Sequence, residues 1–265
     1  SLHPLEPAGK DRAVKGRREL HGASKQGMPA DDARQGLEQA QLRIGLHLGD
    51  HRAKGFALHQ AVGIKDDGEF VGTAGATDEI LDIARHAPSG ANTQPWQVAV
   101  VSGNTKQQLS ESLIHAFREG HASKPDYVYY PETWQSPYID RRRACGLQLY
   151  QSLQIDRKDK HAQRKQWEAN YRAFDAPVMM LFFMDAEMQT GSFLDLGMFI
   201  QNLMLVAQDK GLATCPQAAL AEYPENVKKI LEYPADTILV CGMAIGYEDT
   251  QAAVNKYRTA REPVA

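Results

Sequence analysis

The chain lacks the glycine spacing that dinucleotide-binding domains share. No two of its 21 glycines lie two positions apart, so the 265 residues cannot contain a G-x-G-x-x-G fingerprint. The sequence also has no Walker-type G-K-[ST], no H-E-x-x-H and no G-x-S-x-G. Because no evident protein nucleophile or metal cage remains, the sequence favours a cofactor that brings its own reactivity.

Cysteine, excess charge and long apolar runs are scarce as well. The three cysteines, Cys145, Cys215 and Cys241, lie far apart without a C-x-x-C pair, which argues against a disulfide framework or structural zinc and favours a reducing compartment. The net charge of −3 gives no indication of a basic surface that would bind nucleic acid. The longest apolar run, residues 178–184, is far shorter than the about 18 residues of a membrane span, and we find no signal peptide. We therefore expect a cytoplasmic protein that binds neither nucleic acid nor membrane.

The first 75 residues differ in character from the rest of the chain. They hold more than half of the glycines and most of the nine histidines, and Phe56 and Phe70 are their only aromatic residues. Such a segment buries too little apolar surface to offset the entropy of ordering it. We therefore divide the chain into an atypical N-terminal extension, 1–75, and one folded domain, 76–265.

From residue 77 onward, the helical and strand patterns are those of one compact domain, for which we expect an α+β fold. Helices are expected over 77–87, 105–117, 143–153, 158–174, 193–207 and 224–231, and strands over 97–101, 177–184 and 237–245. Thr77 and Ser192 are the expected N-caps of the first and fifth helices. The helix over 193–207 is apolar on nearly every face, which is typical of a central helix or of one buried between subunits.

Residues 87–96 read Ala-Pro-Ser-Gly-Ala-Asn-Thr-Gln-Pro-Trp and connect the first helix to the first strand. Pro88 ends the helix, and the small residues after it let a flat ligand approach the main chain. The amides of Asn92 and Gln94 carry donors and an acceptor, which match the acceptor–donor–acceptor edge of a flavin. An amide-rich turn with a purely structural role accounts for the residue types equally well.

This ordered string closely resembles the flavin-contacting segment of the FMN-dependent nitroreductase family. Further stretches resemble the same family in the same order, and together they cover about residues 77–263. The stretch over 130–150 is similar to the subgroup that reduces nitrobenzoates and other nitroaromatic compounds. The stretches are 130–134 with 141–143 and 149–150, 176–178, 195–197 with 201–203, 211–220, and 246–247 with 255–258.

The resemblance implies a nitroreductase-like fold, with a mixed, mainly antiparallel central sheet flanked by helices, in an intertwined homodimer with FMN at the interface. It implies a ping-pong reaction in which NADH or NADPH reduces FMN and a small nitroaromatic or quinone-like substrate then takes two electrons. Flavin N5, rather than a catalytic side chain, would carry the chemistry. The implied FMN-binding residues are Pro88, Ser89, Gly90, Asn92 and Gln94 at the ring, Pro216, Gln217, Ala218 and Ala219 near N5, and Lys256 and Arg258 at the phosphate.

Several residues near these motifs have two interpretations. The arginines at 141–143 form either a solvated charge run or place one guanidinium at the O2–N1 edge of the flavin. Trp134 and the tyrosines around it stack on an aromatic substrate or cover the core. Cys215 is expected to be a small buried residue without a redox role. Lys256 and Arg258 would reach one phosphate from the same face of an extended tail.

One element of the family has no counterpart here. Nothing in residues 1–76 reproduces the Arg-x-Ser-x-Arg element followed by Phe. Residues 51–56 are the segment that comes nearest to it. We interpret the extension as atypical, or as a segment read in an altered frame upstream of about residue 76. Each lost charged contact to a buried phosphate costs about 1.5–3 kcal/mol. Two alternatives therefore stay open: another flavin reaction, such as dehalogenation, enone reduction or flavin cleavage, and a non-catalytic flavin-binding dimer.

Overall fold

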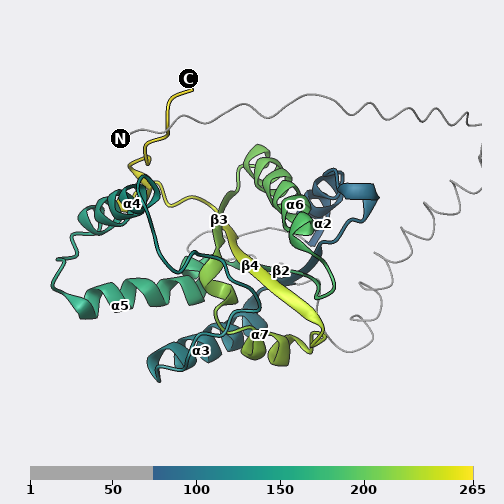
Figure 1. The fold of residues 1–265 in the computed structure, drawn as a ribbon, viewed down its shortest axis with the longest axis horizontal. Coiled ribbons are helices and arrows are strands. Elements are labelled where there is room, and N and C mark those ends of the chain that lie inside the picture. The colour runs from purple at the N-terminus through teal and green to yellow at the C-terminus, as the bar shows by residue number, and fades with distance from the viewer. Residues whose placement is uncertain (1–73, 265) are drawn as a thin grey trace, which may run out of the picture. The chain divides into compact units, whose positions relative to one another are not determined.

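The computed structural model describes residues 74–264, so nearly all of the predicted extension 1–75 lies outside the described residues (Figure 1). The described part contains a four-stranded sheet flanked by helices. The strands are β1 (Gln97–Val101), β2 (Val178–Asp185), β3 (Ala213–Gln217) and β4 (Thr237–Gly246). The helices are α2 (Ala74–Ala84), α3 (Gly103–Arg118), α4 (Tyr138–Ser152), α5 (Lys160–Glu168), α6 (Thr190–Asp209) and α7 (Pro224–Leu231), with 3₁₀ turns η1 (Gly90–Asn92), η2 (Ala169–Asp175), η3 (Ala218–Ala221) and η4 (Ala253–Asn255).

The strands lie in the order β1-β2-β4-β3, and each of these pairings is antiparallel. Ala99, Leu181, Gly242 and Gln217 face one another in a single row across the sheet. β1 and β3 are therefore the two edge strands. The predicted strands near 97–101, 177–184 and 237–245 are all present, whereas β3 lies in the stretch 211–220, for which no strand was predicted.

β2 is buried on both faces, because its neighbouring residues point to opposite sides of the sheet. Met180 and Phe182 pack with α2 and α6, whereas Met179, Leu181 and Phe183 pack with α3 and α7. Figure 1 shows α2 and α6 on one side of the sheet and α3 and α7 on the other. The sheet is thus the middle layer of an α+β domain, the fold class expected from the family resemblance.

Both predicted helix caps are wrong. α2 begins at Ala74, so Thr77 lies within the helix, and α6 begins at Thr190, so Ser192 lies in its first turn. The hydroxyl of Ser192 lies 3.5 Å from Sδ of Met188. Both capping signals therefore lie inside helices that start before them.

α6 has one face on the core and another open to solvent. Leu196, Phe199 and Leu203 are buried, whereas Leu194 and Leu205 are 69% and 59% exposed. By length and composition alone α6 could cross a membrane, a test that core helices of soluble proteins also pass. α4 contains no buried residue at all. Both helices therefore present surface that is available to a further partner.

Candidate functional site

The loop over residues 89–94 is fixed at both ends by hydrogen bonds. The backbone N–H of Gln94 donates to Oγ of Ser89 over 3.0 Å, and the N–H of Gly90 donates to Oδ2 of Asp195 over 3.2 Å. Asp195 is only 8% exposed and lies in the second turn of α6. This buried carboxylate holds η1 against α6.

The same loop contains unusual backbone conformations. Ala91, Asn92 and Gln94 have φ values of 50°, 57° and 48°, in the left-handed region. Such conformations cost on the order of 1 kcal/mol each for residues with a Cβ, so the surrounding hydrogen bonds must maintain them. Nε2 of Gln94 turns back to the carbonyl of Asn92 over 3.3 Å, while Asn92 itself is exposed. The loop is therefore a rigid element that presents Asn92.

The segment 216–219 crosses from the end of β3 into η3 and is anchored by Gln217. This side chain is 4% exposed, and its Nε2 donates to the carbonyl of Asn170 over 3.0 Å. Its Oε1 is buried and accepts no hydrogen bond from residues 74–264. Pro216, by contrast, is exposed. Asn170 thus anchors a segment in which Pro216 remains exposed.

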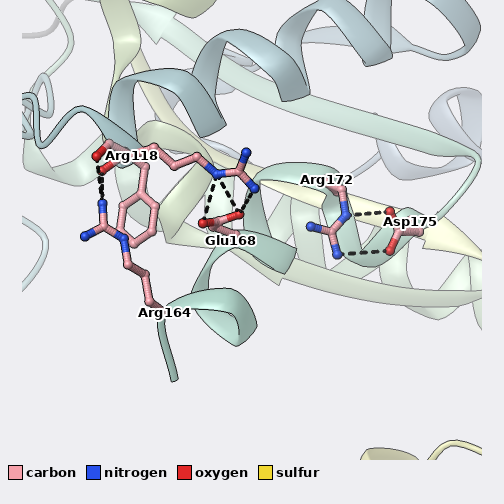
Figure 2. A network of polar contacts seen from close by, with 6 residues as sticks. Arg118, Arg164, Glu168, Arg172 and Asp175 are labelled. Atoms are coloured by element: carbon pink, nitrogen blue, oxygen red, sulfur yellow. Dashed lines mark hydrogen bonds and ion pairs between the residues drawn. The ribbon is translucent and has the colours of Figure 1, made fainter. Parts of the chain in front are cut away.

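A charged network at the junction of α5 and η2 stabilises the segment that contains Asn170 (Figure 2). Nη2 of Arg118 lies 2.6 Å from Oε2 of the buried Glu168, and its hydrogen bonds keep the pKa of that carboxyl below its ordinary value. Nη2 of Arg164 donates to the carbonyls of Phe117 and Arg118 at the end of α3. α3 is therefore tied to the helix that leads directly into η2.

The segment 216–219 lines a broad open cavity of about 1870 Å³. Asn255 and Arg258 of the C-terminal tail line the same cavity, together with Tyr130 and Arg142. The volume exceeds the roughly 300–1000 Å³ of a typical small-molecule pocket. Lys256 and residues 88–94 are absent from the lining. Within one chain, the structure therefore brings Arg258 to residues 216–219 but leaves the loop over 88–94 elsewhere.

The strand order explains this separation. Residues 88–94 lead into the edge strand β1, whereas residues 216–219 follow the opposite edge strand β3. Three strand spacings separate these edges, which corresponds to about 14 Å across the sheet. One chain does not place both segments around a single planar ring.

The two predicted phosphate ligands lie close in sequence but are not related by an extended backbone. Lys256 follows η4 with helical dihedral angles, φ −86° and ψ −3°, so the predicted extended pairing is wrong at this residue. Nη1 of Arg258 donates to the carbonyls of Asn255 and Tyr257. No carboxylate of residues 74–264 forms an ion pair with Lys256 or Arg258, which leaves both charges available for an anion.

Residues with two interpretations from sequence have distinct surroundings. Arg141 pairs with Glu262 over 3.0 Å, whereas the Arg142 guanidinium lies 4.9 Å from the ring centroid of Trp134. The arginine run is therefore not simply solvated. Cys215 is exposed on the edge strand, so its predicted burial is wrong, although partial desolvation raises the pKa of its thiol.

Asp195 and Asn170 are the supporting residues that sequence reasoning missed. Asp195 was noted only within the stretch 195–197 that resembles the family, whereas its carboxylate accepts a hydrogen bond from the N–H of Gly90, 105 positions away. Asn170 lies within a polar helical stretch and carries no local signal of its contact with Gln217. Both contacts depend on the tertiary fold.

Comparison with known proteins identifies the family to which this chain is similar. A sequence model of the nitroreductase family matches residues 73–247. The 4-nitrobenzoate reductase of Pseudomonas putida is 39% identical over 184 residues, which cover 69% of this chain and 80% of that protein. The chloronitrobenzene nitroreductase of Comamonas testosteroni is 35% identical over 184 residues, covering 69% and 81% of the two chains.

Solved structures agree with this result. The FMN and NADPH-dependent nitroreductase NfnB from Sphigopyxis sp. strain HMH superposes with a TM-score of 0.72 at 35% identity, covering 80% of this chain and 94% of that one. The FMN-dependent nitroreductase NfnB from Mycobacterium smegmatis, solved in complex with NADPH, gives a TM-score of 0.69 at 30% identity, covering 77% and 88%. The nitroreductase-like fold predicted from sequence is confirmed, and the chain belongs to the nitroreductase family.

Proposed function

We propose that this protein is an FMN-dependent NAD(P)H oxidoreductase that reduces nitroaromatic or quinone-like compounds in a ping-pong reaction. The observation that carries the proposal is the cavity that brings together residues 216–219 and Arg258, whose guanidinium pairs with no carboxylate of residues 74–264. Among its relatives, the names of the two nitroreductases from Pseudomonas putida and Comamonas testosteroni describe reduction of nitroaromatic compounds. Both solved relatives are described as FMN-dependent.

The residues of the cavity fit this cofactor. Gln217 offers a buried acceptor without a donor among residues 74–264, and Arg258 offers a cation without a carboxylate. When bound, FMN accepts hydride from NAD(P)H and passes two electrons to the second substrate. The protein would supply orientation: Arg258 and Lys256 would hold the phosphate, and main-chain N–H groups of residues 217–219 would act as preorganised donors to the ring.

We further propose that the complete site forms between two copies of the chain. Residues 88–94 of one protomer would complete the cavity lined by residues 216–219 of the other, because one chain separates them across the sheet. The exposed Leu194 and Leu205 on α6 supply apolar surface for such a contact. Exposed apolar faces of this kind mark protein–protein interfaces.

The division of the chain and its location are also proposals. The family match begins at residue 73, which supports a boundary near residue 76 between the extension and the catalytic domain. The scarcity of cysteine supports a reducing, cytoplasmic location.

The test is an anaerobic titration of the full chain after reconstitution with FMN and removal of unbound flavin. NADPH or NADH is expected to bleach the flavin absorbance, and 4-nitrobenzoate or nitrobenzene is expected to restore it. A protein that retains FMN but is not bleached would be a non-catalytic flavin binder. A protein that retains no FMN would contradict the proposed cofactor.

A further inference from the structure

A row of aromatic rings runs from the core to the rim of the cavity; we call it the aromatic ladder. Phe193 of α6 contacts Tyr127, with ring centroids 4.9 Å apart, and Tyr127 lies 6.1 Å from Tyr129. Tyr129 and Tyr130 are 4.5 Å apart, and Tyr130 lies 5.5 Å from Trp134. Centroid distances of 4.5–7 Å are typical of interacting aromatic rings. The ladder is therefore one connected structure.

The inner end of the aromatic ladder is fixed to the sheet. The hydroxyl of Tyr127 donates to the carbonyl of Val240 over 2.8 Å, and burial raises the pKa of this phenol, which stays a neutral donor. The preceding residue, Asp126, accepts from the N–H of Leu239 over 2.8 Å and pairs with Lys228 over 2.9 Å. Two anchors thus hold the start of the ladder against β4.

The outer end of the aromatic ladder ends in a positive charge. The Arg142 guanidinium lies 4.9 Å from the ring centroid of Trp134 and 5.9 Å from that of Tyr130. No carboxylate in the described part of the chain pairs with Arg142, whereas the adjacent Arg141 is neutralised by Glu262. The rings therefore position a guanidinium whose charge is not compensated.

The outer rings are exposed to an unusual degree. Tyr129 is 56% exposed and Tyr130 is 54% exposed, and both line the cavity together with Arg142. Neither tyrosine is among the residues that form the two core clusters or pack against them in residues 74–264. Exposed aromatic rings beside an open cavity are typical of binding surfaces.

We propose that Arg142, with the outer rings Tyr129 and Tyr130, makes this protein selective for aromatic substrates that carry a carboxylate. This inference rests on the proposed function and names its substrate class. The exposed rings would stack on the substrate ring, and the planar guanidinium would donate to both carboxylate oxygens. A neutral nitroaromatic compound would use the rings alone. Arg142 acts as a specificity-determining residue that would contact the carboxylate of the substrate.

The variant Arg142→Gln tests the charge against a matched control. Arg143→Gln removes the same charge from the next position of α4, where the side chain is exposed and does not line the cavity. With 4-nitrobenzoate, R142Q is expected to raise KM about 10-fold with kcat nearly unchanged, as loss of a charged hydrogen bond predicts. With nitrobenzene, R142Q is expected to match the wild type, and R143Q is expected to match it with both substrates.

A binding measurement on the FMN-reconstituted protein makes the test independent of turnover. In calorimetric titrations, R142Q is expected to weaken benzoate binding about 10-fold and to leave benzamide binding unchanged. Arg142→Lys is expected to recover only part of the benzoate affinity, because an ammonium cannot make the planar two-point contact. FMN content and circular dichroism of each variant establish that the fold is intact.

Each outcome bears on one proposal. Equal losses for nitrobenzoate and nitrobenzene, or no loss for either, would overturn the role of Arg142 while leaving the reductase activity in place. A wild-type protein that reduces neither compound would instead contradict the proposed function. If R143Q lost as much benzoate affinity as R142Q, general surface charge would explain the loss and the specific role of Arg142 would be overturned.

Discussion

The variant Asp126→Ala probes the contact that anchors the aromatic ladder to the sheet. Oδ2 of Asp126 accepts from the N–H of Leu239 over 2.8 Å and lies 2.9 Å from Nζ of Lys228. The two side chains of the ion pair are only 22% and 12% exposed. Alanine would leave a backbone donor of β4 and a largely buried ammonium without this acceptor.

The size of the effect follows from these contacts. An unsatisfied buried donor costs about 1–3 kcal/mol, and breaking a buried ion pair costs about 3–5 kcal/mol. Lys228 still donates to the carbonyl of Thr237 over 2.6 Å, and both side chains touch solvent, which lowers the sum. We expect the free energy of unfolding to fall by about 3 kcal/mol. The melting temperature would then fall by about 6–12 °C for a domain of this size.

Urea and thermal unfolding at one fixed protein concentration measure this change, since the stability of the proposed dimer would depend on concentration. Asp82→Ala is the control: its exposed pair with Arg85 spans 2.7 Å, and its loss is expected to cost at most about 0.5 kcal/mol. Asp126→Asn keeps an acceptor for Leu239 and should fall between the two. If D126A and D82A unfolded at the same urea concentration, the anchoring role would be refuted.

Two further variants test the supports of the loop over 216–219. Arg118 keeps the pKa of Glu168 below 4.5, so this carboxylate stabilises the fold above that pH and its contribution is lost as the pH falls through the folded-state pKa. Glu168→Gln should therefore be less stable than the wild type at pH 7, with a difference in urea midpoint that shrinks toward pH 3; a constant difference would contradict this. Gly242→Ala would place a Cβ 2.4 Å from Cδ1 of Leu220, so we expect about 1–3 kcal/mol of destabilisation and weaker FMN retention. Gly191→Ala, with no atom within 4 Å of the added Cβ, should have neither effect in the same unfolding and flavin-binding assays.

Local patterns were enough to predict most of the elements. The seven apolar residues from Val178 to Met184 could only form a strand buried on both faces, and α7 begins and ends where Pro224 and the apolar spacing predicted. β3 was missed because its sequence, ATCPQ, has neither apolar alternation nor β-branched residues beyond one threonine. Its strand character comes from pairing with β4, which no local pattern encodes.

The candidate site, like the fold, could be predicted only in part from local sequence. The motif around Asn92 and the segment 216–219 could be recognised from sequence, but their placement at opposite sheet edges depends on the strand order β1-β2-β4-β3. The exposure of Cys215 follows from the same edge position. The contact between Asp195 and Gly90 could not be predicted, since a carboxylate near a helix start is normally explained by the helix itself.

A mixed-dimer experiment tests most directly whether two chains share each flavin site. Asn92→Trp would obstruct the ring-contacting loop, and a second chain carrying Lys256→Glu and Arg258→Glu would lose the phosphate contacts; we expect neither protein alone to retain FMN. After the two are unfolded and refolded together, random pairing should restore FMN to about one quarter of the sites, because half of the dimers are mixed and each has one intact site. A mixture that retains no more FMN than its two components would contradict the two-chain site.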